Sequence, residues 1–175
     1  MTERERKEGP VPTTQRLRSL PEVFDLRDLM IDAGYDYGTA KVAVSGWAKR
    51  DYVRSAGRGT GVYYNLVRNE RGASARLGEA VSRIVPSPVV IGASAIQEAG
   101  WTTQRSELVE VAIPRTPRFR SRPNLAGAAV FPRPPGWYRR VSDALVDGPH
   151  GLPALPPGLA LADAAADGRT RPRRA

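Results

Sequence analysis

Apolar residues recur at helical spacing in two segments near the start of the chain. In "DLRDLMIDAG", which begins at Asp25, they fall at positions i, i+3, i+4 and i+7, namely Leu26, Leu29, Met30 and Ala33. Asp25 is placed to cap this helix, with Asp28 three residues on, and Gly34 suits the left-handed residue that follows a helix. The pattern predicts one well-bounded helix that faces a core.

A second amphipathic helix is predicted after the turn "GYD", with Asp36 as its N-terminal cap. The segment "YGTAKVAVSGWAKR" has an apolar face made of Ala40, Val44, Trp47 and Ala48. Lys41, Ser45 and Lys49 recur every four residues on the opposite face, which is therefore polar and basic. Two helices joined by a short glycine-containing turn, the second with a polar outward face, form a helix-turn-helix pattern.

The flanking segments complete a small module. A short helix, "TQRLRSL", is expected before Pro21, capped by Thr13 or Thr14, and "EVF" is extended. "DYVRS" and "GVYYNLV" are rich in Val and Tyr and flank the loop "AGRGTG", as in a β-hairpin. Three short helices followed by a hairpin is the order of a winged helix, which we predict over residues 13–68.

The loop "AGRGTG" has three interpretations: a wing on DNA, a phosphate-binding glycine loop, or a simple turn. It lacks the GxxxxGK[ST] spacing and leads from strand to strand, so no helix dipole would face a phosphate. The basic helix before it favours the wing over the simple turn. Tyr63 and Tyr64 point to opposite faces of the second strand, so we expect one to pack on Trp47 and the other to reach phosphate.

The winged-helix hypothesis assigns DNA contacts to both the helix and the hairpin. The first half of the helix would enter the major groove, and the cations after it would contact the backbone. The expected contacts are Tyr37, Gly38, Thr39, Lys41, Ser45, Lys49, Arg50, Arg54, Arg58 and Thr60. The alternative for this helix face is an ordinary solvated surface.

The rest of the chain predicts a small α+β domain over residues 73–168. "ARLGEAVSRIV" has helical spacing, "ASAIQEAGW" is a helix of small residues, and "VVI", "ELVEVAIP" and "LAGAAVF" have strand patterns. The fold class is therefore α+β, with a winged helix-turn-helix followed by a small α+β domain. Residues 1–12 are expected to be a flexible arm and residues 169–175 a disordered basic tail.

The amino-acid composition limits the classes of partner and binding site that the protein can have. The chain has 175 residues, with 27 Lys plus Arg against 18 Asp plus Glu, and the net charge of +9 favours an anionic partner such as DNA. The absence of cysteine excludes disulfides and thiolate metal sites. The only histidine, His150, is expected to be a surface loop residue. Without a signal peptide or a run of roughly 18 apolar residues, the protein is expected to be cytoplasmic, with no membrane partner.

A second basic surface is suggested between Ile113 and Val141, where the chain has no acidic residue. Its seven arginines are Arg115, Arg118, Arg120, Arg122, Arg133, Arg139 and Arg140. The interleaved aromatics are Phe119, Phe131, Trp137 and Tyr138. One interpretation is a nucleic-acid surface of guanidinium groups and stacking rings. The other is a proline-rich hairpin whose aromatic side chains return to the core, and the sequence leaves both open.

The sequence does not predict an enzyme, a cofactor or a metal site. The serines have neither a "GxSxG" motif nor a histidine partner. Outside the first module, Asp163 and Asp167 are an acidic pair with i, i+4 spacing on a predicted helix, and we expect them to be an exposed helix face rather than a metal-binding pair.

Three blocks in this order resemble the AbiEi antitoxins of type IV toxin–antitoxin systems. "FDLRDLMIDAGYDYGTAKVAVSGWAKRDYVRSAGRGTGVYYNL" is similar to their N-terminal winged helix, and "VVIGASAIQEAGWTTQRSELVEVAIP" to the start of their antitoxin domain. "LPALPPGLALADAAADG" is similar to their helix with an "ALAD" signature, here Ala160 to Asp163. The resemblance covers residues 20–168.

The resemblance implies a non-enzymatic antitoxin that represses its own operon through the winged helix. It would bind double-stranded DNA at a promoter inverted repeat, where a dimer is conceivable, and counter a nucleotidyltransferase-like toxin without a tight complex. The alternative is a stand-alone regulator whose second domain dimerises or binds an effector. A nuclease-like enzyme is a third hypothesis, for which the acids do not provide a metal site.

Overall fold

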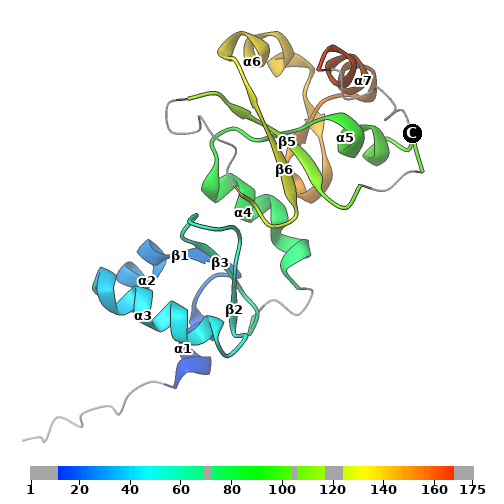
Figure 1. Ribbon diagram of the computed structural model, residues 1–175. Helices are drawn as coiled ribbons and strands as arrows, with labels where there is room; N and C mark the ends of the chain where they lie inside the picture. The colour runs from blue at the N-terminus through cyan, green and yellow to red at the C-terminus, as the bar shows by residue number, and fades with distance from the viewer. Residues whose placement is uncertain (1–11, 69–71, 104–105, 117–123, 168–175) are drawn as a thin grey trace, which may run out of the picture.

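The computed structural model describes residues 12–68, 72–103, 106–116 and 124–167, and it belongs to the α+β class. It contains a three-stranded sheet in its N-terminal part and a five-stranded sheet in its C-terminal part (Figure 1). The N-terminal elements are α1 (Thr13–Ser19), β1 (Val23–Asp25), α2 (Leu26–Asp32), α3 (Tyr37–Ala48), β2 (Val53–Ser55) and β3 (Val62–Asn65). Hydrophobic spacing predicted α2 and α3, and the capping, proline and Val/Tyr signals predicted α1 and the three strands.

The helices of the N-terminal part begin where local capping favours them. Asp25 accepts hydrogen bonds from the amides of Arg27 (2.7 Å) and Asp28 (3.2 Å), while the Asp28 carboxylate accepts one from the Asp25 amide (2.9 Å). This reciprocal pair is a capping box, so the predicted cap of α2 is confirmed. Asp36 caps α3 as expected, and Gly34 adopts the left-handed conformation with φ of 64°.

Three details of these helices differ from the prediction. Thr13 and Thr14 do not cap α1, because the helix begins one residue earlier and the carbonyl of Pro12 already accepts from the Arg16 amide. Met30 is 41% exposed, since the short α2 reaches the core mainly through Leu29. Ala48 is also exposed, at the last position of α3 where the chain turns away from the core.

The three-stranded sheet has the order β1-β3-β2, with antiparallel neighbours, and both of its faces are covered. On one face, Phe24, Val53 and Tyr63 pack with Trp47 and the other core residues of α1 to α3. On the other face, Tyr64 packs with Val23, Val62 and Ala80, the last of which belongs to α4 in the C-terminal part. Tyr63 therefore behaves as expected, and a Tyr64 contact with phosphate is excluded because its side chain is only 2% exposed.

The C-terminal part is built on a mixed sheet with the order β6-β5-β4-β8-β7. Its elements are η1 (Ala73–Arg76), α4 (Leu77–Ile84), β4 (Val89–Val90), α5 (Gly92–Glu98), β5 (Val109–Pro114), β6 (Ala128–Arg133), α6 (Pro135–Val141), η3 (Ser142–Ala144), β7 (Val146–Asp147), η4 (Pro149–Gly151), β8 (Pro153–Ala154) and α7 (Pro157–Ala166). The strand patterns predicted β4, β5 and β6, and the helical patterns predicted α4, α5 and α7.

Helix α6 is an addition to the prediction. Its start, "PPGW", contains residues that usually interrupt a helix. Proline is nevertheless favoured at the first helical position, where the missing amide would have no partner, and Pro135 occupies that position. The helix brings Trp137 and Val141 into the core.

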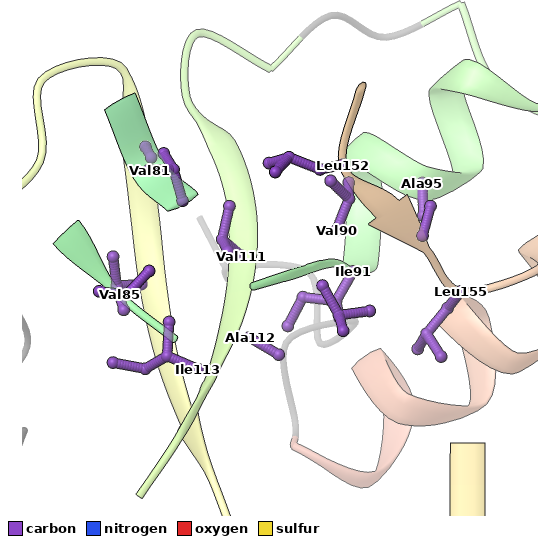
Figure 2. Close-up of a cluster of buried hydrophobic side chains, with 14 of the residues drawn as sticks. Val81, Val85, Val90, Ile91, Ala95, Val111, Ala112, Ile113, Leu152 and Leu155 are labelled. Carbon is purple, nitrogen blue, oxygen red and sulfur yellow. The ribbon is translucent and has the colours of Figure 1, made fainter. Parts of the chain in front are cut away.

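One buried cluster joins the C-terminal sheet to the helices around it. Figure 2 shows Val111 and Ile113 of β5 pointing towards Val81 of α4 and Val85 just after it, whereas Ala112 points the other way. Each of the five is less than 2% exposed. Alternation along the strand therefore gives both faces of this sheet an apolar cover.

The two parts are joined by packing and by ion pairs. Arg76 makes a bidentate pair with Glu22, at 2.6 and 3.0 Å, and Arg83 lies 2.7 Å from the Asp28 carboxylate of the capping box. Both arginines lie on η1 or α4 and both acids lie in the N-terminal part. Together with Ala80, these contacts fix α4 against the N-terminal part.

The tip of the β2–β3 hairpin also touches the C-terminal part. The Ala126 amide donates to the Ala56 carbonyl at 2.8 Å, and a Cβ added to Gly57 would lie only 2.0 Å from the Asn124 carbonyl oxygen. Ala56 is 1% exposed and Gly57 is buried. The first residues of "AGRGTG" thus form a packed contact, and only a glycine fits at position 57.

We expect Gly57→Ala to lower the free energy of unfolding by about 1–3 kcal/mol, since the new methyl group must displace backbone. Gly46→Ala is the matched control, because Gly46 lies in α3 with no atom within 4 Å of an added Cβ. It should instead raise stability by about 0.5–1 kcal/mol through helix propensity. Urea unfolding of both variants measures the difference, and equal stability of the two would contradict the packed hairpin tip.

Candidate nucleic-acid interface

The outward face of α3 is exposed over its whole length. Its buried residues, Ala40, Val44 and Trp47, all lie on the face towards the core. The predicted contacts on the helix and just after it are all exposed, namely Tyr37, Gly38, Thr39, Lys41, Ser45, Lys49 and Arg50. From Tyr37 to Arg50 the chain has three basic residues and no acidic one. This face can therefore approach a polyanion without an internal carboxylate opposing it.

The first turn of α3 differs from the rest because Asp36 stands beside it. The Asp36 carboxylate accepts hydrogen bonds from the hydroxyl of Thr39 and, at 3.0 Å, from its amide. These bonds, the hydroxyl one foremost, hold the pKa of Asp36 below its ordinary value, so the group is ionised at neutral pH. A phosphate near Thr39 would meet this negative charge, and the Thr39 hydroxyl is already engaged.

Lys41 and Tyr37 are neighbours on this face. The Lys41 ammonium lies 5.4 Å from the centroid of the Tyr37 ring, within the range of a cation–π contact. Such a contact at an exposed site is weak, so Lys41 can exchange it for an anionic ligand.

The hairpin contributes fewer groups than the sequence predicted. Arg58 is exposed and has no ion pair among the residues that the structure describes. The Thr60 hydroxyl donates to the Gly57 carbonyl (2.8 Å) and lies 3.3 Å from the Val62 amide, so it shapes the loop. Thr60 is therefore engaged within the loop, whereas Arg58 keeps an exposed side chain with no ion pair among the described residues.

Arg54 lies on the wrong face of the sheet to act beside α3. The strand register places Arg54 opposite Tyr64, on the face that α4 covers. Val53 and Ser55 share the other face with Tyr63, where the helices pack. Side chains alternate along a strand, so the expectation that Arg54 projects beside the basic face of α3 is wrong.

Arg133 is not part of a basic surface, contrary to the prediction. It is 8% exposed, and its guanidinium donates to Asp163 at 2.7 Å and also to Asp167, both on or just after α7. The Trp137 indole donates to the other Asp163 oxygen at 2.7 Å, and Arg133 lies 5.8 Å from the Trp137 ring. This group, which we call the Arg133 clamp, joins β6, α6 and α7.

The Arg133 clamp also corrects the interpretation of Asp163 as part of an exposed face, whereas Asp167 is exposed as expected. The Asp163 side chain is only 12% exposed, because Arg133 and Trp137 cover it. The signal in the sequence was the i, i+4 spacing of two acids on one helix face, which suits a guanidinium as well as a metal. What the sequence lacked was the partner, which comes from a strand 30 residues away.

The remaining arginines between Ile113 and Val141 form two groups, those that are exposed and those that lie outside the described residues. Arg115, Arg139 and Arg140 are exposed, and Arg118, Arg120 and Arg122 lie outside the described residues, as does Phe119. Phe131 and Tyr138 are partly buried against the core and Trp137 is buried, and burial raises the pKa of the Tyr138 hydroxyl. These three aromatics therefore return to the core, as the second interpretation expected. Arg139 and Arg140 lie on α6, at the far end of the C-terminal part from α3 (Figure 1).

His150 is exposed in η4, with a left-handed φ of 60°. It lines a cavity of about 160 Å³ together with Ser94 and Gln97, which the sequence did not predict. The Ser94 hydroxyl accepts the Glu110 amide at 2.9 Å, and this bond ties α5 to β5. Ser94 thus has a structural role that accounts for its 8% exposure.

Within the described ranges, no three His, Asp or Glu side chains gather as they would around a metal ion. The helices in those ranges are all too short or too polar to cross a lipid bilayer. A scan of known protein-family models finds no match to this chain, and a search of curated proteins finds no similar sequence. The resemblance to the AbiEi antitoxins therefore rests on the three sequence blocks alone.

Proposed function

We propose that this protein binds double-stranded DNA through α3 and represses its own operon as the antitoxin of a type IV toxin–antitoxin system. The observation that carries the DNA-binding part is the outward face of α3, which is exposed, basic and free of carboxylates from Tyr37 to Arg50. A face of this kind gains affinity from counterion release when it neutralises phosphates.

The arrangement of the N-terminal part supports a winged helix. A helix, a strand, two helices and a hairpin follow one another, and the sheet order β1-β3-β2 places the hairpin beside β1. In this proposal α3 is the recognition helix and the β2–β3 loop is the wing. Because the start of the loop is packed against Asn124 and Ala126, the wing would present only its far side, with Arg58, to the duplex.

The charges suggest where the duplex would lie along α3. Asp36 disfavours phosphate at the first turn, whereas Lys41, Lys49 and Arg50 favour it further along. The groove contact would therefore centre on the middle of the helix rather than on its first turn. Two copies bound to an inverted repeat would each place one α3 in successive major grooves.

The antitoxin part of the proposal is supported by the sequence resemblance. In it the C-terminal part counters a nucleotidyltransferase-like toxin without a tight complex, in the cytoplasm and without enzymatic activity of its own.

The alternative is a stand-alone regulator whose C-terminal part dimerises or binds an effector. It is favoured by the contact of the hairpin tip with Asn124 and Ala126, because a change in the C-terminal part could move the wing.

Binding to the promoter upstream of its own gene should fall steeply with salt. We expect Lys41→Ala to weaken binding about tenfold, and Arg58→Ala to lower the slope of log K against log salt by about one. Gel-shift titrations at several salt concentrations measure both effects. Arg139→Ala, which removes an exposed arginine far from α3, is the control and should leave the slope unchanged. Parental binding by both test variants would overturn the groove and wing assignments.

Antitoxicity can be separated from repression by co-expression with the neighbouring gene from a foreign promoter. If that gene encodes a nucleotidyltransferase-like toxin, the protein should restore growth, and Arg58→Ala should restore it equally, since the proposed antitoxic part is the C-terminal one. Colony counts give the result. Growth arrest that persists in the presence of the parent protein would favour the stand-alone regulator.

A further inference from the structure

We infer that Val42 recognises the 5-methyl group of a thymine in the major groove. This inference rests on the proposed function, since it names what α3 reads once it lies in the groove. It adds a residue that the expected DNA contacts left out.

Val42 stands at the centre of the outward face of α3. At 100° per residue, the buried residues Ala40, Val44 and Trp47 lie together on one side of the helix, and Val42 lies almost opposite their mean direction. Its side chain is 75% exposed, a large value for a β-branched apolar residue in a helix. The packing of the N-terminal core therefore does not explain why an apolar residue stands at position 42.

The residues around Val42 leave its methyl groups accessible to a flat surface. Four residues before and four residues after it, on the same helical row, are Gly38 and Gly46. The fold does not require glycine at position 46, where an added Cβ would meet nothing within 4 Å, and glycine weakens a helix by roughly 0.5–1 kcal/mol relative to alanine. Val42 therefore projects from a ridge of bare backbone that can approach a ligand closely.

The charges beside this ridge favour DNA over an apolar protein partner. Lys41, Ser45 and Lys49 flank Val42, and all three are exposed. In a major groove these cations can reach phosphates or base edges while Val42 faces the bases. Another helix packed on the ridge would have to bury Lys49 next to it, at a large desolvation cost.

Thymine is the base that suits an apolar group at this position. Its major-groove edge carries a methyl group at C5, where cytosine has only a hydrogen, and the purine edges present hydrogen-bond donors or acceptors instead. Burying one of those against Val42 would cost a hydrogen bond to water, whereas burying a methyl group is favourable. Val42 thus both favours thymine and disfavours the other bases.

The test uses the full protein and a duplex selected from a randomised pool, with each selected thymine replaced in turn by uracil, which removes only the methyl group. For the parent protein, we expect one uracil replacement per half-site to weaken binding about threefold to fivefold, the effect of burying one methyl group. For Val42→Ala, that replacement should have no effect, and the affinity for the uracil duplex should equal that of the parent.

Leu161→Ala is the matched control, because Leu161 is an exposed aliphatic residue, 48% accessible, on α7 of the C-terminal part. It should keep the parental sensitivity to uracil. Each other outcome shows which statement is wrong, the inference about Val42 or the proposed DNA binding. If the parent selects a duplex but Val42→Ala keeps the uracil sensitivity, the inference is wrong and DNA binding stands.

Two further results would also overturn the inference. If the parent binds no duplex at any salt concentration, DNA binding itself is wrong, and the inference with it. If Val42→Ala changes the sedimentation of the free protein and leaves base preference unchanged, the ridge is a surface for self-association.

Discussion

The packing of α4 between the two sheets is the interaction on which the rest of the structure depends. Ala80 faces Tyr64 on the three-stranded sheet, and the next residue, Val81, faces the core of the five-stranded sheet. Without α4, the outer face of the smaller sheet would expose Val23, Val62 and Tyr64, each of which is worth about 1.5–3 kcal/mol when buried. The N-terminal part therefore depends on the C-terminal part for its own core.

This constraint limits which surfaces of the N-terminal part are open to the proposed DNA partner. One face of the small sheet packs on α1 to α3 and the other on α4, so the core side chains of both faces are buried. The tip of the hairpin is fixed by the Ala126–Ala56 hydrogen bond. The ion pairs of Arg76 and Arg83 are partly exposed, so they contribute more to orientation than to stability. In the N-terminal part, the outward face of α3 and Arg58 on the loop stay exposed.

The sequence predicted what is encoded locally and missed what depends on distant partners. The caps at Asp25 and Asp36 were found because cap and amide lie within three residues of each other. The burial of Tyr64 and of Arg133 was missed because Ala80 and Asp163, which cover them, come from other elements. In the candidate site, the exposure of the outward face of α3 could be predicted from the helical spacing of its polar residues. The orientation of Arg54 was not, because it needs the strand register as well as the position of α4.

The distribution of the arginines shows why net charge alone is a poor guide to the interface. Several of the cations behind the charge of +9 are neutralised where they lie: Arg133 by Asp163 and Asp167, Arg76 by Glu22, and Arg83 by Asp28. Lys41, Lys49, Arg50 and Arg58 have no ion pair among the described residues. Counterion release depends on such unpaired, exposed cations that reach phosphate together. The outward face of α3 meets that requirement, whereas the arginine-rich segment uses one of its arginines to hold α7 in place.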